Sequence, residues 1–160
     1  TGHLCLATLH ANSANQALDR IINFFPEDKR DQLLMDLSLN IKGIISQRLI
    51  PRENSAGRVA AMEILLHSPL VSDLIAKGEV AELKEAMKRS NRIGMNTFDQ
   101  ALFTLFEDGK ISYDEALKNA DSKNEVRLRI KLESKRAEQD PTAVSDNLNL
   151  IEEDRGAVIR

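Results

Sequence analysis

The sequence predicts an α/β fold that continues into a mostly α-helical C-terminal region. A short apolar run at residues 4–9 has the length and composition of a fully buried parallel strand. An amphipathic helical pattern follows that run at once, and from residue 68 onward apolar residues recur at helical spacing. Because a parallel strand needs neighbours and none is predicted before residue 4, we expect residue 1 to lie inside the fold of a longer protein.

Composition limits the classes of function. The 160 residues suffice for one ordinary domain with a packed core, and the formal net charge of −3 gives no general attraction to nucleic acid or anionic lipid. The single cysteine, Cys5, cannot form a disulfide within the chain, which favours a reducing cytoplasm. No apolar run approaches the ~18 residues that cross a bilayer. We therefore expect a cytoplasmic protein with no nucleic-acid partner and no direct membrane insertion.

The first predicted helix follows the strand directly. Ser13 and Gln16 have the spacing of a capping box, in which side chains bond to free backbone groups at a helix start. The apolar residues that follow share one helical face, and Pro26 ends the helix. A second, longer helix is expected over residues 27–46. Two short strands are expected over residues 49–52 and 58–66, so that residues 1–67 form the α/β part of the chain.

A helical subdomain is expected over residues 68–120. It begins at Ser68-Pro69, because the missing amide hydrogen of proline would be unpaired anyway at a first helical position. Short apolar helical faces follow, and Ser112 with Glu115 repeats the capping-box spacing before the last of them.

Residues 121–160 form a charged tail of different character. Residues 126–132 alternate apolar and basic side chains with a period of two, which predicts a half-exposed strand. The weaker segment 148–151 could pair with it, and the polar residues 135–145 between them resemble a flexible connector. We therefore expect a β-hairpin or a partly disordered tail.

A metal site was tested against strand geometry, since His3, Cys5 and His10 lie close in the sequence. In an extended run His3 and His10 stand roughly 23 Å apart, at ~3.3 Å per residue. They also differ in parity, so they face opposite sides of the strand. The spacing matches no zinc pattern, and we expect no metal site.

His10 is the strongest candidate for chemistry. It follows the carboxyl end of the predicted strand and precedes a helix N-terminus, two positions that favour anionic ligands in α/β folds. Thr8, His10, Asn12 and Ser13 could therefore present donors to a phosphate. The alternative is a histidine that caps the helix or fills a corner.

Two further charged residues have open interpretations. Arg20, on the polar side of the first helix, could contact a phosphate or a subunit interface, or could simply be solvated. Glu63 lies inside a predicted strand, where a paired structural carboxylate is the simpler interpretation. The sequence contains no G-x-x-x-x-G-K-[ST] motif that would hold nucleotide phosphates.

Several short motifs occur in the same order as in a known superfamily. They are Thr1-Gly-His-Leu-x-x-x-Thr8-Leu-His10-x-Asn12-Ser-Ala14, Arg20-Ile21, Ser46-Gln-Arg-Leu49, Gly57-Arg-Val-Ala-Ala-Met-Glu63-Ile, Gly94-Met95-x-Thr97-x-Asp99-x-x-Leu102 and Gly109-x-Ile111-Ser112. The first resembles the His box of the secretion and type IV pilus ATPase superfamily, and the series covers residues 1–120. Within it the chain resembles the type IV pilus retraction (twitching motility) ATPases of the PilT/PilU family. It is most like PilU, in its 58–63 strand and its charged tail.

This resemblance implies a C-terminal fragment, starting at the His box, of a RecA-like P-loop ATPase core that works as a hexamer. ATP and Mg²⁺ would be bound mainly by residues upstream of this chain, which lacks Walker A and Walker B and is expected to be inactive alone. His10 would sense the γ-phosphate, Thr8 would connect it to the magnesium side, and His3 and Arg20 would serve nucleotide or subunit interfaces. The motor would lie in the cytoplasm, peripheral at the inner membrane, and contact a pilus platform protein there.

One departure from the family pattern bears on whether this motor drives retraction independently. PilT-like proteins characteristically carry Ala-Ile-Arg-Asn-Leu-Ile-Arg-Glu where this chain has Leu70-Val-Ser-Asp-Leu-Ile-Ala-Lys77, without either arginine. This fits an accessory, PilT-dependent role in a homo-hexamer or a mixed assembly. The alternatives are a pilus-assembly or type II secretion ATPase, whose usual tetracysteine element is absent here, and a non-enzymatic helical interaction module.

Overall fold

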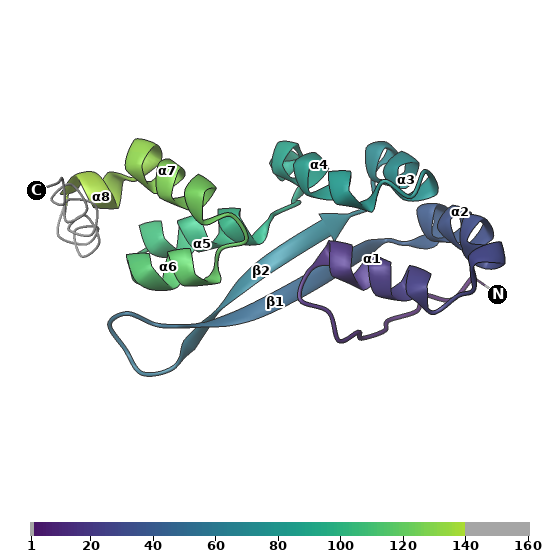
Figure 1. Ribbon diagram of the computed structural model, residues 1–160. Coiled ribbons are helices and arrows are strands. Elements are labelled where there is room, and N and C mark those ends of the chain that lie inside the picture. Colours follow the sequence, from purple (N-terminus) through teal and green to yellow (C-terminus); the bar gives the residue numbers. More distant parts are fainter. Residues whose placement is uncertain (1, 140–160) are drawn as a thin grey trace, which may run out of the picture. The chain divides into compact units, whose positions relative to one another are not determined.

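The computed structural model describes residues 2–139 and is a mixed helix–strand structure that is mostly helical (Figure 1). Its contacts divide it into two compact units. The first contains residues up to 49 together with 60–101, and the second contains residues 50–59 together with those from 102 onward.

The first unit holds four helices, three short 3₁₀ turns and most of a two-stranded sheet among the described residues. In chain order the elements are α1 (Ala14–Asn23), η1 (Glu27–Lys29), α2 (Arg30–Asn40), β1 (Gly43–Pro51), β2 (Arg58–Leu66), α3 (Pro69–Ala76), η2 (Val80–Glu82), α4 (Leu83–Arg89) and η3 (Asn91–Ile93). The tips of both strands belong to the second unit. β1 and β2 pair with each other, and Lys42 O, just before β1, accepts from His67 N just after β2.

The core of this unit gathers side chains from α1, β2, α3, η2 and α4, together with Met95 from the segment before α5. Its buried members are Ala14, Leu18, Leu65, Val71, Leu74, Ile75, Val80, Leu83, Ala86, Met87 and Met95. The face of β2 that points inward carries Ala61, Glu63 and Leu65, because alternate strand residues share a face. The strand therefore brings one carboxylate, Glu63, to the buried side.

Two predicted helix starts in this unit are confirmed. The Ser13 hydroxyl accepts from Gln16 N at 3.3 Å, and the Ser68 hydroxyl accepts from Val71 N at the same distance. Pro69 occupies the first turn of α3, as expected.

The predicted long helix over residues 27–46 is wrong in its second half. α2 ends at Asn40, and residues from Gly43 onward form β1. The β-branched residues Ile41, Ile44 and Ile45 favour an extended backbone, and pairing with β2 supplies its hydrogen bonds. Gly43 suits the pairing, since a Cβ there would lie 3.0 Å from Leu65 O.

The second unit is built from the helices that follow. They are the greater part of α5 (Phe98–Glu107), then α6 (Tyr113–Asn119), α7 (Lys123–Glu133) and α8 (Lys135–Gln139). The Ser112 hydroxyl accepts from Glu115 N at 3.3 Å and so caps α6 as predicted. Phe106 and Tyr113 pack edge to face, with ring centroids 6.3 Å apart.

The strand predicted over residues 126–132 is wrong, because this segment is helix α7. Val126 and Ile130 are buried, whereas Leu128 and Leu132 are 56% and 69% exposed. An i, i+4 pair satisfies a helix as well as a strand, and here helix α6 offers a surface against which α7 packs. The proposed partner segment 148–151 lies outside the described residues.

The buried strand predicted over residues 4–9 is also wrong in this structure. These residues form neither helix nor strand, and Leu4 and Leu6 are 75% and 89% exposed. Within the described residues the sheet contains β1 and β2 alone, so no strand lies beside this segment to pair with its backbone groups.

Candidate functional site

The segment that carries the His-box residues leads directly into α1. Thr8 and His10 are exposed and lie outside regular structure, and α1 begins four residues after His10. Ala11 N donates to Leu9 O at 3.0 Å, which turns the backbone at His10. The imidazole is thus presented at the approach to a helix, as its place in the sequence predicted.

The N-terminus of α1 is closed by protein groups. Ala14 N, at the first helical position, donates to Glu63 Oε1 at 2.8 Å, and both residues are buried. Gln16 N donates to the Ser13 hydroxyl, and Gln16 Oε1 in turn accepts from Asn12 N at 3.1 Å. A carboxylate therefore occupies the positive end of this helix, which stabilises the helix.

This arrangement decides how the segment could meet a phosphate. The helix terminus is less available than the sequence suggested, because Ala14 N and Gln16 N already have acceptors and a phosphate there would lie close to the Glu63 carboxylate. The exposed side chains of Thr8, His10 and Asn12 remain suited to a phosphate oxygen.

Arg48 of β1 makes a second contact with the same segment. Its Nη2 donates to Asn12 O at 3.4 Å, and its guanidinium carbon lies 3.8 Å from the centroid of the Phe98 ring. Asn15 Nδ2 also donates to Val80 O at 2.9 Å. Hydrogen bonds to β1, β2 and η2 thus fix the residues just after His10.

Only part of this site could be predicted from the sequence. Arg48 lay inside one of the recognised motifs but had no assigned role, and Glu63 had only a structural interpretation. Strand alternation is the signal that could have placed them, since Arg48 shares a face with the buried residues Ser46 and Ile50.

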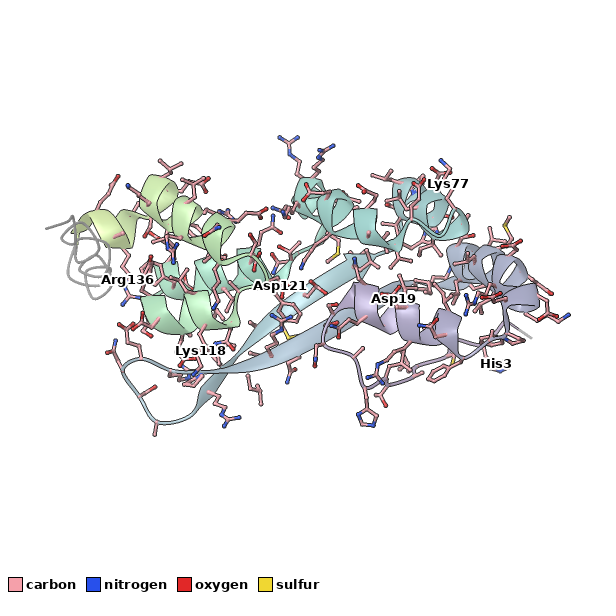
Figure 2. All side chains as sticks on the ribbon, viewed as in Figure 1. His3, Asp19, Lys77, Lys118, Asp121 and Arg136 are labelled. Carbon is pink, nitrogen blue, oxygen red and sulfur yellow. The ribbon has the colours of Figure 1, made fainter. Side chains whose placement is uncertain are left out.

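The other two candidate residues lie elsewhere in this unit. His3 is exposed in the segment before α1 (Figure 2). Arg20 is exposed in the last turn of α1, so it lies at the opposite end of the helix from His10, about 10 Å along an axis that rises 1.5 Å per residue. The structure does not bring Arg20 to the His10 end.

Residues 2–139 contain neither a candidate metal site nor a helix that could span a membrane. No three histidine, cysteine, aspartate or glutamate side chains gather there as a metal ion would require. Within the same residues, each helix is too short or too polar to traverse a bilayer.

Comparison with known proteins places these features in a family. The family model described as Type II/IV secretion system protein matches residues 1–96. The type IV pilus ATPase PilU of Pseudomonas aeruginosa is 56% identical over 150 residues, which are 94% of this chain and 39% of that protein. The type IV pilus retraction ATPase PilT of the same organism is 37% identical over 120 residues, 75% of this chain and 35% of that protein.

A solved structure supports the same relationship. The crystal structure of the pilus retraction motor PilT with bound ADP superposes with a TM-score of 0.71 at 32% identity, over 80% of this chain and 35% of that one. The chain spans less than two fifths of the length of each of these relatives. It belongs to the Type II/IV secretion system protein family, in the group that includes the type IV pilus ATPases PilU and PilT.

Proposed function

We propose that this chain is the C-terminal part of a hexameric ATPase motor that hydrolyses ATP to power type IV pilus retraction and twitching motility. The observation that carries the proposal is the 56% identity, over 94% of the chain, to a protein named as a type IV pilus ATPase. The likeness to a PilT structure with bound ADP supports a RecA-like nucleotide-binding core, completed by residues outside this chain.

His10 and Thr8 are the residues of this chain that we assign to the nucleotide. Both side chains are exposed, so they can meet a triphosphate held by P-loop residues of the same or a neighbouring subunit. An imidazole N–H can donate to a terminal phosphate oxygen, and the Thr8 hydroxyl can donate beside it. Mg²⁺, when bound with ATP, supplies neutralisation of phosphate charge.

The remaining assignments concern assembly. His3, in the segment before α1, and Arg20, in the last turn of α1, are exposed and suit contacts with a neighbouring subunit of the ring. The motor would act in the cytoplasm, at the inner membrane, on a pilus platform protein. Because α3 carries Ser72 and Ala76 rather than arginines at the positions of the PilT-like segment, we assign the chain an accessory role beside a PilT-like ATPase.

ATP turnover by the full-length subunit tests the role of His10. The His10→Ala variant should lower kcat about tenfold or more while leaving KM within about twofold, because the contact serves the transferring phosphate more than ground-state binding. His67→Ala is the matched control, an exposed histidine between β2 and α3 whose Nε2 lies 3.2 Å from Ser38 O, and it should keep wild-type turnover. Wild-type kcat in the His10 variant would contradict the assignment.

Pilus retraction in cells tests the motor role. Deleting the gene should reduce retraction force or twitching distance while PilT is present. Expressing the protein in a strain without PilT should restore neither. Retraction driven by this protein in the absence of PilT would contradict the accessory role. Unchanged retraction after deletion of the gene would contradict the proposed function in pilus retraction.

A further inference from the structure

We propose that Glu63 is a positioning residue for His10, acting through the first amide of α1 rather than on the nucleotide. The inference rests on the proposed function of His10. It goes beyond that function because it assigns a role to a buried carboxylate in β2, 53 positions further along the sequence.

The first step is the hydrogen bond itself. Glu63 Oε1 accepts from Ala14 N at 2.8 Å, and both residues are shielded from water. A bond to a charged acceptor in such a place is stronger than a neutral one, and removing the acceptor leaves a buried N–H unpaired. The bond therefore fixes where α1 begins.

The second step connects that point to His10. Only three residues separate His10 from Ala14, and one of them, Asn12, is held at its carbonyl by Arg48 Nη2 at 3.4 Å. The backbone between the histidine and the helix is thus tied to both strands of the hairpin, to β2 by Glu63 and to β1 by Arg48. A shift of β2 against α1 would move the imidazole with it.

The positioning role of Glu63 can be distinguished from general core packing. Leu65 lies on the same buried face of β2 and belongs to the apolar core, but its side chain is no hydrogen-bond acceptor. Leu65→Ala therefore weakens packing without touching the Ala14 amide, and it is the matched control for Glu63→Ala.

Amide hydrogen exchange in this chain tests the contact without nucleotide. The exchange rate of the Ala14 amide is measured relative to that of Val71, whose N–H donates to Ser68 in α3. Glu63→Ala should raise this ratio about tenfold or more. Glu63→Gln, which keeps a carbonyl acceptor, should raise it less, and Leu65→Ala should leave it unchanged. An unchanged ratio in Glu63→Ala would overturn the inference, because any faster exchange at Ala14 would then be matched at Val71 and would reflect a general loss of stability.

ATP turnover by the full-length subunit tests the consequence. Glu63→Ala should lower kcat about tenfold with KM within about twofold, and Glu63→Gln should recover part of the loss. The double variant of Glu63→Ala with His10→Ala should turn over no more slowly than His10→Ala alone, since Glu63 acts through that residue. If the losses in kcat of the two single variants add in the double variant, the inference is overturned, but the proposed role of His10 is unaffected. A His10→Ala variant with full turnover would instead remove the proposed function, and the inference with it.

Discussion

The guanidinium of Arg136 lies 2.6 Å from the carboxylate of Glu53, measured from Nη2 to Oε2, inside the second unit (Figure 2). The two side chains are 19% and 26% exposed. Nη1 of the same arginine donates to Phe106 O at 2.8 Å and to Ile111 O at 3.0 Å, and the guanidinium lies over the Phe106 ring. One side chain of α8 thus joins the turn after β1 to the connection between α5 and α6.

Replacing Arg136 should destabilise the second unit measurably. Arg136→Ala removes a donor from the Glu53 carboxylate and from two carbonyls, although Phe106 O still accepts from Gly109 N, and we expect a loss of about 2–3 kcal/mol in the free energy of unfolding. Arg136→Lys should lose less, because it keeps the charge but not the planar fork. Fluorescence of Tyr113, the single tyrosine of a chain without tryptophan, reports this unit during urea unfolding.

Lys118→Ala is the control for that measurement. Lys118 also pairs with a glutamate, Glu115, but its side chain is 74% exposed. Exposed pairs of this kind contribute about 0.5 kcal/mol or less. Equal losses in the free energy of unfolding of the Arg136→Ala and Lys118→Ala variants would contradict the importance of the partly buried contacts of Arg136.

The stability of α8 should depend on pH through Glu107. Burial acts to raise the pKa of Glu107, but hydrogen bonds from the Ser134 hydroxyl and from the backbone of Arg136 and Lys135 outweigh it and lower the pKa. A lowered pKa in the folded state means that the contribution is present above the ordinary value of 4.5 and is lost as pH falls through the folded-state pKa. Glu107→Gln should therefore be less stable than wild type at pH 7, with a difference that vanishes in acid.

The control for Glu107 is Glu85, whose pKa is also lowered, first by a hydrogen bond from Lys88 and then by its charge. That pair lies on the surface, so salt should screen it. Urea unfolding of Glu85→Gln in high salt should match wild type across the pH range. A Glu107→Gln difference that persists unchanged below the folded-state pKa would show that the charge is not responsible.

Helix starts could be predicted from this sequence because a cap is a local interaction. The hydroxyls of Ser13, Ser68 and Ser112 each accept from the amide three residues later, a spacing visible in the sequence itself. The apolar face of α1 followed from helical periodicity, and the bounds of β2 followed from an apolar run that begins after the turn-rich residues 53–57.

Partner-dependent elements could not be predicted in this way. Residues 4–9 match a buried strand in composition, but a strand forms only beside another strand. The site shows the same limit. The position of His10 before α1 is local and was predicted, whereas the bond between Ala14 N and Glu63 joins residues 49 positions apart. No periodicity or motif in the sequence indicates which backbone amide will donate to a buried carboxylate.

Gly94 should resist replacement because of its backbone. Its φ is +90°, in the left-handed region, and a Cβ there would meet Leu66 Cδ1 at an ordinary 3.6 Å. The cost of Gly94→Ala is therefore conformational, about 1–2 kcal/mol. Gly94→Asn should lose less, since asparagine adopts this conformation more readily. Circular dichroism during thermal unfolding measures both, and equal losses would point to steric crowding instead.

The helical state of α7 gives a prediction that distinguishes it from the strand its sequence suggests. In a strand, residues 126, 128, 130 and 132 would share one face and contribute alike. In the helix Ile130 is fully buried and Leu132 is largely exposed. Ile130→Ala should therefore cost about 2–4 kcal/mol by leaving a cavity, and Leu132→Ala about 0.5 kcal/mol or less. Urea unfolding followed by Tyr113 fluorescence compares them in one unit, and similar losses for the two variants would favour the strand.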